Sequence, residues 1–171
     1  MGKEKAAGAL YNLAANADNQ VAIASKEQGA LAALVALLRD ESAVGKEKAA
    51  AALWSLAVNN DDNKVAIAKE EGALAALVAL LRDGSAVGKE YAACALGNLS
   101  FNAVNKVAIA EEQGALAALV VLLRDGSAVG KETAAAVLSS LAVNADNKVA
   151  IAEEHGALAA LVALFCARGA R

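Results

Sequence analysis

The sequence predicts an all-α protein made of tandem repeats, and three observations lead to that prediction. The chain of 171 residues contains no proline and is 58% hydrophobic and 20% charged. It is rich in alanine, which favours helix because alanine loses no side-chain entropy on becoming helical. The tripeptide Gly-Lys-Glu recurs at Gly2, Gly45, Gly88 and Gly130, with periods of 43, 43 and 42 residues. Apolar residues recur at helical spacing within each period, and a fixed period of this length is typical of a solenoid.

The period divides the chain into four units, residues 2–44, 45–87, 88–129 and 130–171, which we interpret as one domain. The one-residue difference falls where residues 59–63 of the second unit become residues 102–105 of the third. A loop absorbs such a change at little cost. Each unit has apolar faces too wide to bury alone, so neighbouring units are expected to stack.

Three helices are expected in each unit. In the second unit the longest covers residues 46–58, because Ala49, Ala52, Leu53 and Leu56 fall at the i, i+3, i+4, i+7 spacing of one helix face. A short helix over residues 63–71 follows, opened by Asp and Asn side chains that can accept free backbone N–H groups.

The short helix is expected to end at a glycine, because glycine takes the left-handed conformation at little cost. This residue is Gly72 in the second unit, and the others carry Gly29, Gly114 and Gly156. The last helix covers residues 73–82, and residues 83–85, Asp-Gly-Ser, break it before the next unit. Its apolar face consists of Leu74, Leu77, Val78 and Leu81.

These units resemble the armadillo repeat over essentially the whole chain. The segment Ala-Leu-Trp-Ser-Leu-Ala at 52–57 is similar to the third helix of that family, Val-Ala-Ile-Ala at 65–68 to its first, and residues 72–84 to its second. The resemblance implies a right-handed superhelical solenoid of three-helix repeats, whose third helices line a concave groove that holds extended peptides. Alanine stands where the family usually has proline, at Ala32, Ala75, Ala117 and Ala159. An extra residue also precedes Gly72, and both departures favour a consensus-like or engineered sequence.

The third helices offer the candidate binding face. When the four copies are compared within the chain, the variable positions cluster mostly on the side opposite the leucines. Aromatic rings can cover the apolar parts of a peptide, and amide groups can pair with its backbone. Alternatively, rings at helical spacing fill gaps between helices. The predicted groove residues are Lys5, Tyr11, Asn12, Lys48, Trp54, Ser55, Tyr91, Asn98, Phe101 and Ser140.

The expected ligand is an extended peptide or protein segment. Helices stack about 10 Å apart, so four of them span roughly 30 Å, which is about nine residues of extended chain. Micromolar or weaker affinity is expected, because the third helices offer only two groove asparagines, Asn12 and Asn98, and each hydrogen bond contributes only about 1 kcal/mol net. No Asp or Glu occupies the variable positions, which disfavours recognition of basic nuclear-import signals.

Other function classes are disfavoured. A net charge of −3 offers no basic patch for nucleic acid, and no apolar run reaches the roughly 20 residues of a membrane span. The single histidine and the separated Cys94 and Cys166 predict no metal site and no catalytic group. The segment 126–133 lacks the spacing of a phosphate-binding loop. We therefore expect no enzyme activity and no cofactor, and an intracellular, reducing location in cytoplasm or nucleus.

The two ends of the chain predict self-association. The chain starts at a third helix and stops after a second helix, and neither terminus replaces its apolar stripe by charges. The exposed stripes are expected to be Ala6, Leu10 and Leu13 at one end, and Leu158, Leu161, Val162 and Phe165 at the other. Head-to-tail stacking or end-to-end pairing would bury both. The alternative function is accordingly a self-associating structural or engineered scaffold with no natural ligand.

Overall fold

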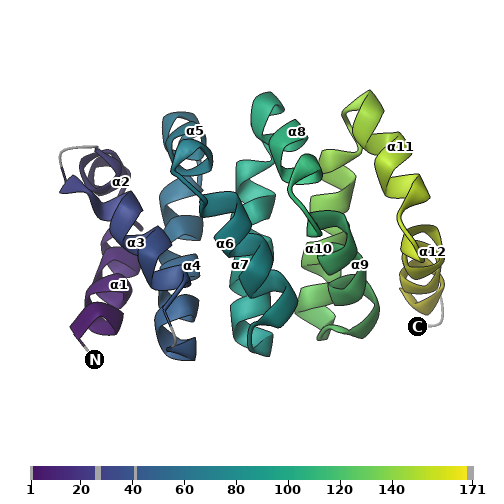
Figure 1. The fold of residues 1–171 in the computed structure, drawn as a ribbon, viewed down its shortest axis with the longest axis horizontal. Coiled ribbons are helices and arrows are strands. Elements are labelled where there is room, and N and C mark those ends of the chain that lie inside the picture. Colours follow the sequence, from purple (N-terminus) through teal and green to yellow (C-terminus); the bar gives the residue numbers. More distant parts are fainter. Residues whose placement is uncertain (1, 26–27, 41, 169–171) are drawn as a thin grey trace.

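The structure is a computed structural model that describes residues 2–25, 28–40 and 42–168. Twelve helices lie within these residues, in groups of three placed side by side (Figure 1). They are α1 (Gly2–Leu13), α2 (Ala17–Ala24), α3 (Ala30–Leu38), α4 (Ala43–Ala57), α5 (Asp61–Lys69), α6 (Ala73–Asp83), α7 (Ala86–Leu99), α8 (Ala103–Glu111), α9 (Ala115–Asp125), α10 (Ala128–Leu141), α11 (Ala145–Glu153) and α12 (Ala157–Arg168). The all-helical repeat architecture expected from the sequence is thereby confirmed.

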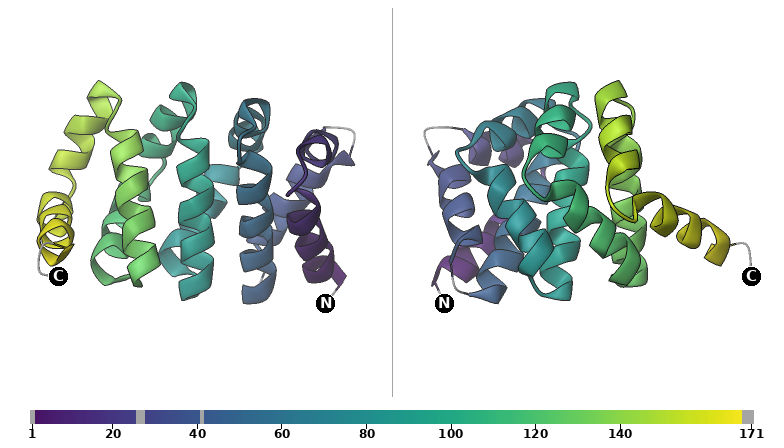
Figure 2. Two further views of the ribbon diagram at one scale, coloured as in Figure 1. Left: turned by 180° about the vertical axis from the view of Figure 1, so that it is seen from behind. Right: turned by 45° about the vertical axis from the view of Figure 1, so that its right-hand side comes forward.

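The helices form layers that correspond to their place in the repeat. Helices α1, α4, α7 and α10 stand in a row on the face that Figure 2 brings forward in its left view. These four are the third helices of the repeat. The second helices, α3, α6 and α9, cover the opposite side, and the short first helices lie along the top edge in Figure 1. The row of third helices is therefore a continuous surface.

Serine side chains set the start of the third helices. Ser42, Ser85 and Ser127 each accept a hydrogen bond from a backbone N–H three residues on, at 3.1, 3.0 and 3.0 Å. Such N-caps satisfy one of the free donors of a helix terminus. Helix α4 consequently begins at Ala43, three residues before the predicted start at 46.

Asparagine acts in the same way at the short helices. The Asn60 side chain accepts from the Asn63 backbone N–H at 2.9 Å, so α5 begins at Asp61 and ends at Lys69, two residues earlier than predicted at both ends. Gly72 has the left-handed conformation expected for it, with φ of 68°. It lies directly before α6, two residues beyond the Glu70 cap of α5.

Close packing of small residues on leucines builds the core. In α4 the residues Ala49, Ala52, Leu53 and Leu56 are completely buried. Helix α4 packs against α1 on one side and α7 on the other, as well as against α3. Alanine on its flanks allows this close approach of neighbouring helices, and leucine fills the space beneath.

Buried asparagines join each repeat to the one before it. The side-chain amide of Asn105 donates to the carbonyl of Leu99 at 3.1 Å and to that of Lys64 at 3.0 Å. Asn63 and Asn147 make the equivalent pairs of bonds in the flanking repeats. Each amide therefore satisfies one carbonyl at the end of its own third helix and one in the preceding first helix. This ladder fixes how successive repeats stack.

Helix α12 differs from the internal second helices in its burial. It contacts α9 and α11, and it projects from the stack in the right view of Figure 2. Val78 and Leu81 of α6 are 3% and 1% exposed, whereas Val162 and Phe165 at the same repeat positions in α12 are 60% and 81% exposed.

No single helix in the described ranges has the length and hydropathy of a membrane span; α11 and α12 reach both only as a pair bent by 88°.

The face of the third helices as a candidate binding site

Three aromatic side chains from three successive third helices form one cluster. The ring of Trp54 on α4 lies 6.3 Å from that of Tyr11 on α1 and 6.1 Å from that of Tyr91 on α7, and the two tyrosine rings are 6.5 Å apart. These distances are typical of favourable ring pairs. All three rings are half-buried. Each ring packs against the core, as one of the two interpretations of the sequence expects, and keeps part of its surface exposed.

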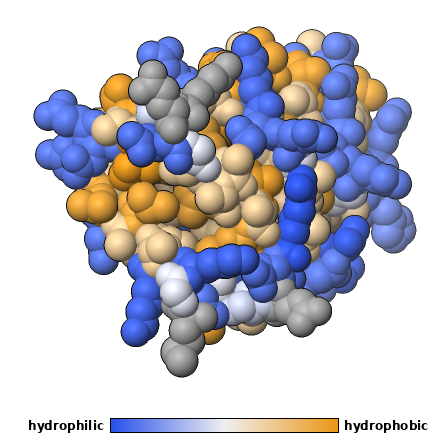
Figure 3. Space-filling view, turned by 60° about the vertical axis from the view of Figure 1, so that its left-hand side comes forward, coloured by the Kyte–Doolittle hydropathy of each residue, from blue (hydrophilic) through white to orange (hydrophobic). Residues whose placement is uncertain are grey.

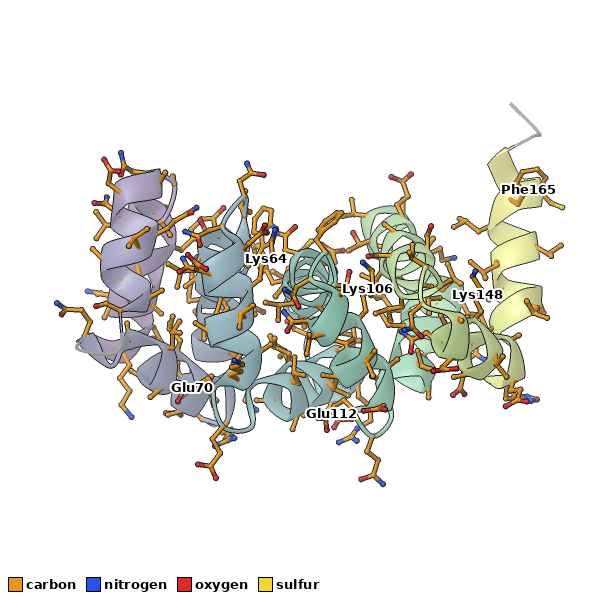
Figure 4. All side chains as sticks on the ribbon, turned by 90° about the horizontal axis from the view of Figure 1, so that it is seen from above. Lys64, Glu70, Lys106, Glu112, Lys148 and Phe165 are labelled. Carbon is orange, nitrogen blue, oxygen red and sulfur yellow. The ribbon has the colours of Figure 1, made fainter. Side chains whose placement is uncertain are left out.

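Among the predicted groove residues, the aromatic ring outside this cluster is that of Phe101, which is 68% exposed. It follows the end of α7 at Leu99, in the turn before α8, so it lies beyond the helix on which the sequence pattern placed it. The Lys64 ammonium lies 5.6 Å from the centre of the Phe101 ring and 2.7 Å from an Asp61 carboxylate oxygen. Figure 4 shows Lys64, Lys106 and Lys148 near the starts of successive first helices, with Glu70 and Glu112 at the far ends.

A hollow of about 520 Å³ opens between α7 and α10. Its volume lies within the range of sites that hold small ligands or side chains, about 300–1,000 Å³. It includes four predicted groove residues, Trp54, Asn98, Phe101 and Ser140. It also includes residues outside the predicted groove set, namely Cys94, Gly97, Glu132, Thr133, Ala136 and Val137.

The other predicted groove residues lie outside this hollow. Tyr11 and Tyr91 belong to the aromatic cluster, and the Lys48 side chain passes over Gly8, where an added Cβ would lie 3.8 Å from Lys48 Cδ. Lys5 and Asn12 are exposed on α1, and Ser55 is half-buried on α4. The predicted set thus spreads along the row of third helices.

Two of the polar groove residues already have partners in the fold. Ser140 Oγ lies 2.8 Å from Ser100 Oγ and 3.2 Å from the Ser100 carbonyl oxygen, which joins α10 to α7. The Asn98 amide donates to the Trp54 carbonyl at 3.5 Å, the long limit of a hydrogen bond. Asn98 therefore retains hydrogen-bonding capacity for a ligand, whereas the Ser140 hydroxyl is engaged between repeats.

The chemistry of the hollow is mainly apolar. Burial raises the pKa of the Cys94 thiol, and a hydrogen bond with Thr133 lowers it by less, so the thiol stays neutral near neutral pH. Burial also raises the pKa of Tyr91. Although no acidic residue occupies the variable positions, Glu132 of the constant tripeptide lines the rim. Within the described residues, no group of three His, Cys, Asp or Glu side chains is placed to hold a metal ion.

Comparison with known proteins places this architecture in a family. The model of the Armadillo/beta-catenin-like repeat matches residues 60–101. A crystal structure described as computationally designed armadillo repeat proteins for modular peptide recognition shares 35% identity with a TM-score of 0.85, covering 94% of this chain and 67% of that one. The chain belongs to the armadillo repeat family. Another similar structure is a designed armadillo repeat protein in complex with the peptide (KR)4, with 33% identity, a TM-score of 0.84, and coverage of 94% of this chain and 66% of that one.

This armadillo repeat chain spans about two thirds of the length of those structures. No curated protein matches it. An engineered protein with 31% identity and a TM-score of 0.85 has the same fold over 94% of the chain. The sequence-based prediction of an armadillo repeat protein is therefore confirmed.

Proposed function

We propose that this armadillo repeat chain is a non-catalytic scaffold that binds an extended peptide along its third helices. The observation that carries the proposal is the aromatic cluster of Tyr11, Trp54 and Tyr91, which continues into the hollow between α7 and α10. Half-buried rings give a peptide rigid apolar surface at little entropic cost, and Asn98 beside them can pair with its backbone. The design of a similar structure for modular peptide recognition supports this use of the face.

A binding role is also favoured by the state of the cysteine on this face. Activation of a cysteine requires a lowered pKa, whereas burial raises that of Cys94. The exposed His155 lies in the turn between α11 and α12. We therefore assign Cys94 to the lining of the hollow and not to catalysis.

Selection from a random peptide library tests the proposal. We expect the unmodified chain to enrich peptides, and the triple variant Asn12→Ala, Asn98→Ala, Trp54→Ala to lose that enrichment while keeping its helicity. Enrichment should be lost because the variant removes the Trp54 ring from the aromatic cluster and the side-chain amides of Asn12 and Asn98. A matched control, Arg82→Ala with Arg124→Ala, changes exposed residues at the ends of α6 and α9 and should enrich the same peptides. Unchanged enrichment by the triple variant would contradict the proposal.

A second candidate function, self-association of the 171-residue chain, is favoured by two exposed apolar surfaces. One is the face of α12 that carries Val162 and Phe165. The other is a groove of about 320 Å³ between α1 and α3, seen as the apolar area of the end that Figure 3 brings forward. The groove is lined by Lys3, Ala6, Ala7, Leu10, Ala33, Leu34, Ala36 and Leu37.

The internal repeats show how these two surfaces would fit. Helix α6 packs against α7 and α9, and α1 and α3 are the equivalents of α7 and α9 in the first repeat. We propose that α12 of one copy takes the same place on α1 and α3 of another, burying Val162 and Phe165 as Val78 and Leu81 are buried within the chain. Such a contact is heterologous and can add further copies.

A further inference from the structure

The gaps between third helices are filled in one place and open in the next. Between α4 and α7 the rings of Trp54 and Tyr91 lie 6.1 Å apart and occupy the space. One repeat further on, Gly97 and Thr133 stand at the corresponding positions, and the hollow of about 520 Å³ lies there instead. The hollow therefore lies where Gly97 and Thr133 replace two aromatic side chains.

The lining of the hollow suits a flat apolar group. Trp54 and Phe101 contribute rings, and Val137 lies beneath Gly97, where an added Cβ would come within 3.2 Å of Val137 Cγ2. The neutral Cys94 thiol and Ala136 add small apolar surface. Asn98 and Thr133 supply polar atoms that could pair with a phenol O–H or an indole N–H.

The charges next to the hollow have opposite signs, Glu132 at its rim and Lys64 at the Phe101 ring, so a basic group is disfavoured at that ring. The Lys64 ammonium already lies over the Phe101 ring, at 5.6 Å from its centre. A second cation at the same ring would meet a like charge, because cation–π contacts act over about 6 Å. A neutral ring meets no such repulsion.

We propose that the hollow between α7 and α10 is a subsite for an aromatic side chain of the bound peptide. This inference rests on the proposed function, of which it names the ligand class. The side chain takes the place that Trp54 and Tyr91 fill one repeat earlier, and it packs against Trp54 and Phe101. Binding peptides accordingly carry a Phe, Tyr or Trp residue at the position that faces the repeat of Gly97.

The hollow is tested first with a small probe and without a peptide. In a Cys166→Ser background, alkylation of Cys94 by iodoacetamide is followed by mass spectrometry with and without p-cresol, which has the ring of a tyrosine side chain. We expect p-cresol to slow the reaction of Cys94, because the occupied hollow shields the thiol. The saturated analogue 4-methylcyclohexanol should protect less, and n-butylamine, which resembles a lysine side chain, should not protect.

Two variants test whether p-cresol protects Cys94 by binding in the hollow. Thr133→Tyr restores the ring present at Tyr91 and fills the hollow, so it should slow alkylation by itself and remove the effect of p-cresol. Ser139→Tyr adds the same ring at an exposed position of α10 that does not line the hollow, and it should keep the p-cresol effect. An absent p-cresol effect, equal protection in Thr133→Tyr, or stronger protection by n-butylamine would overturn the inference.

The peptides from the library selection separate this inference from the proposed function. We expect each enriched peptide to contain an aromatic residue whose replacement by alanine weakens binding by about tenfold to a hundredfold, the range expected for burying such a side chain. Thr133→Tyr should weaken binding to a similar extent, and Ser139→Tyr should not. Enriched peptides without an aromatic preference, unaffected by Thr133→Tyr, would contradict the subsite and leave the peptide-binding function standing. No enrichment at all would contradict the function itself.

Discussion

Replacing Asn105 by alanine should lower the free energy of unfolding by about 1–3 kcal/mol, because it removes two buried hydrogen bonds that each contribute about 0.5–1.5 kcal/mol net. The substitution removes both hydrogen bonds of a side chain that is only 4% exposed, one to Leu99 and one to Lys64. These bonds join α8 to the end of α7 and to the preceding repeat. The change is large for a protein whose total stability is typically about 5–15 kcal/mol.

Urea unfolding followed by circular dichroism measures this effect. The midpoint should fall while the dependence on urea concentration stays similar. Asn12→Ala is the matched control, since Asn12 is exposed and substitutions of that kind usually change stability by less than about 0.5 kcal/mol. A loss below about 1 kcal/mol in Asn105→Ala would mean that water replaces the amide, and that the ladder does not hold the repeats together.

The second large effect is a complete loss of self-association on blocking either apolar surface. Val162→Glu with Phe165→Glu places charges on the exposed face of α12, and Ala33→Glu with Ala36→Glu places them in the groove between α1 and α3. All four residues are exposed in the single chain, so neither variant disturbs the core. Light scattering across a hundredfold range of concentration should show growing mass for the unmodified chain and constant monomer mass for each variant.

Mixing the two variants gives the most specific outcome. One variant keeps the groove and the other keeps the α12 face, so together they have one intact pair of surfaces. A one-to-one dimer, and nothing larger, is expected from the mixture. A strictly monomeric mixture, or an unmodified chain that stays monomeric at the highest concentration, would contradict head-to-tail docking of α12.

The sequence contained enough information to predict the repeat and its helices, but not their ends. The spacing of Gly-Lys-Glu and of the leucines depends on local geometry, so it predicted three helices per unit and the left-handed Gly72. The Ser42 cap was missed, because the apolar pattern starts only after the first turn of that helix. Capping of the short helix by Asp and Asn was predicted, but its start was placed at 63, whereas Asn60 caps a helix that begins at Asp61. Asn63 was interpreted as the start of a helix, whereas it is buried against the neighbouring repeat. That role depends on how the repeats stack, which cannot be predicted from a local sequence pattern.

Comparison of the four copies indicated a candidate face but not its shape. The variable positions correctly included the rings that gather at Trp54. The hollow lies where side chains are small, with Gly97 in place of a ring and Thr133 in place of Tyr91, whereas the groove prediction rested on the side chains that are present. Phe101 and Ser140 could not be placed in advance, because one lies beyond the helix end and the other bonds across to Ser100.

The central claim, that a peptide binds along the third helices, is tested most directly by the fluorescence of Trp54. It is the only tryptophan in the chain, and it lies between the aromatic cluster and the hollow, so its emission reports on this face alone. Titration with a peptide enriched from the library should shift the emission to saturation, with the same dissociation constant as calorimetry. Calorimetric binding that leaves the Trp54 emission unchanged would show that the peptide binds elsewhere and would contradict the proposed function of this face.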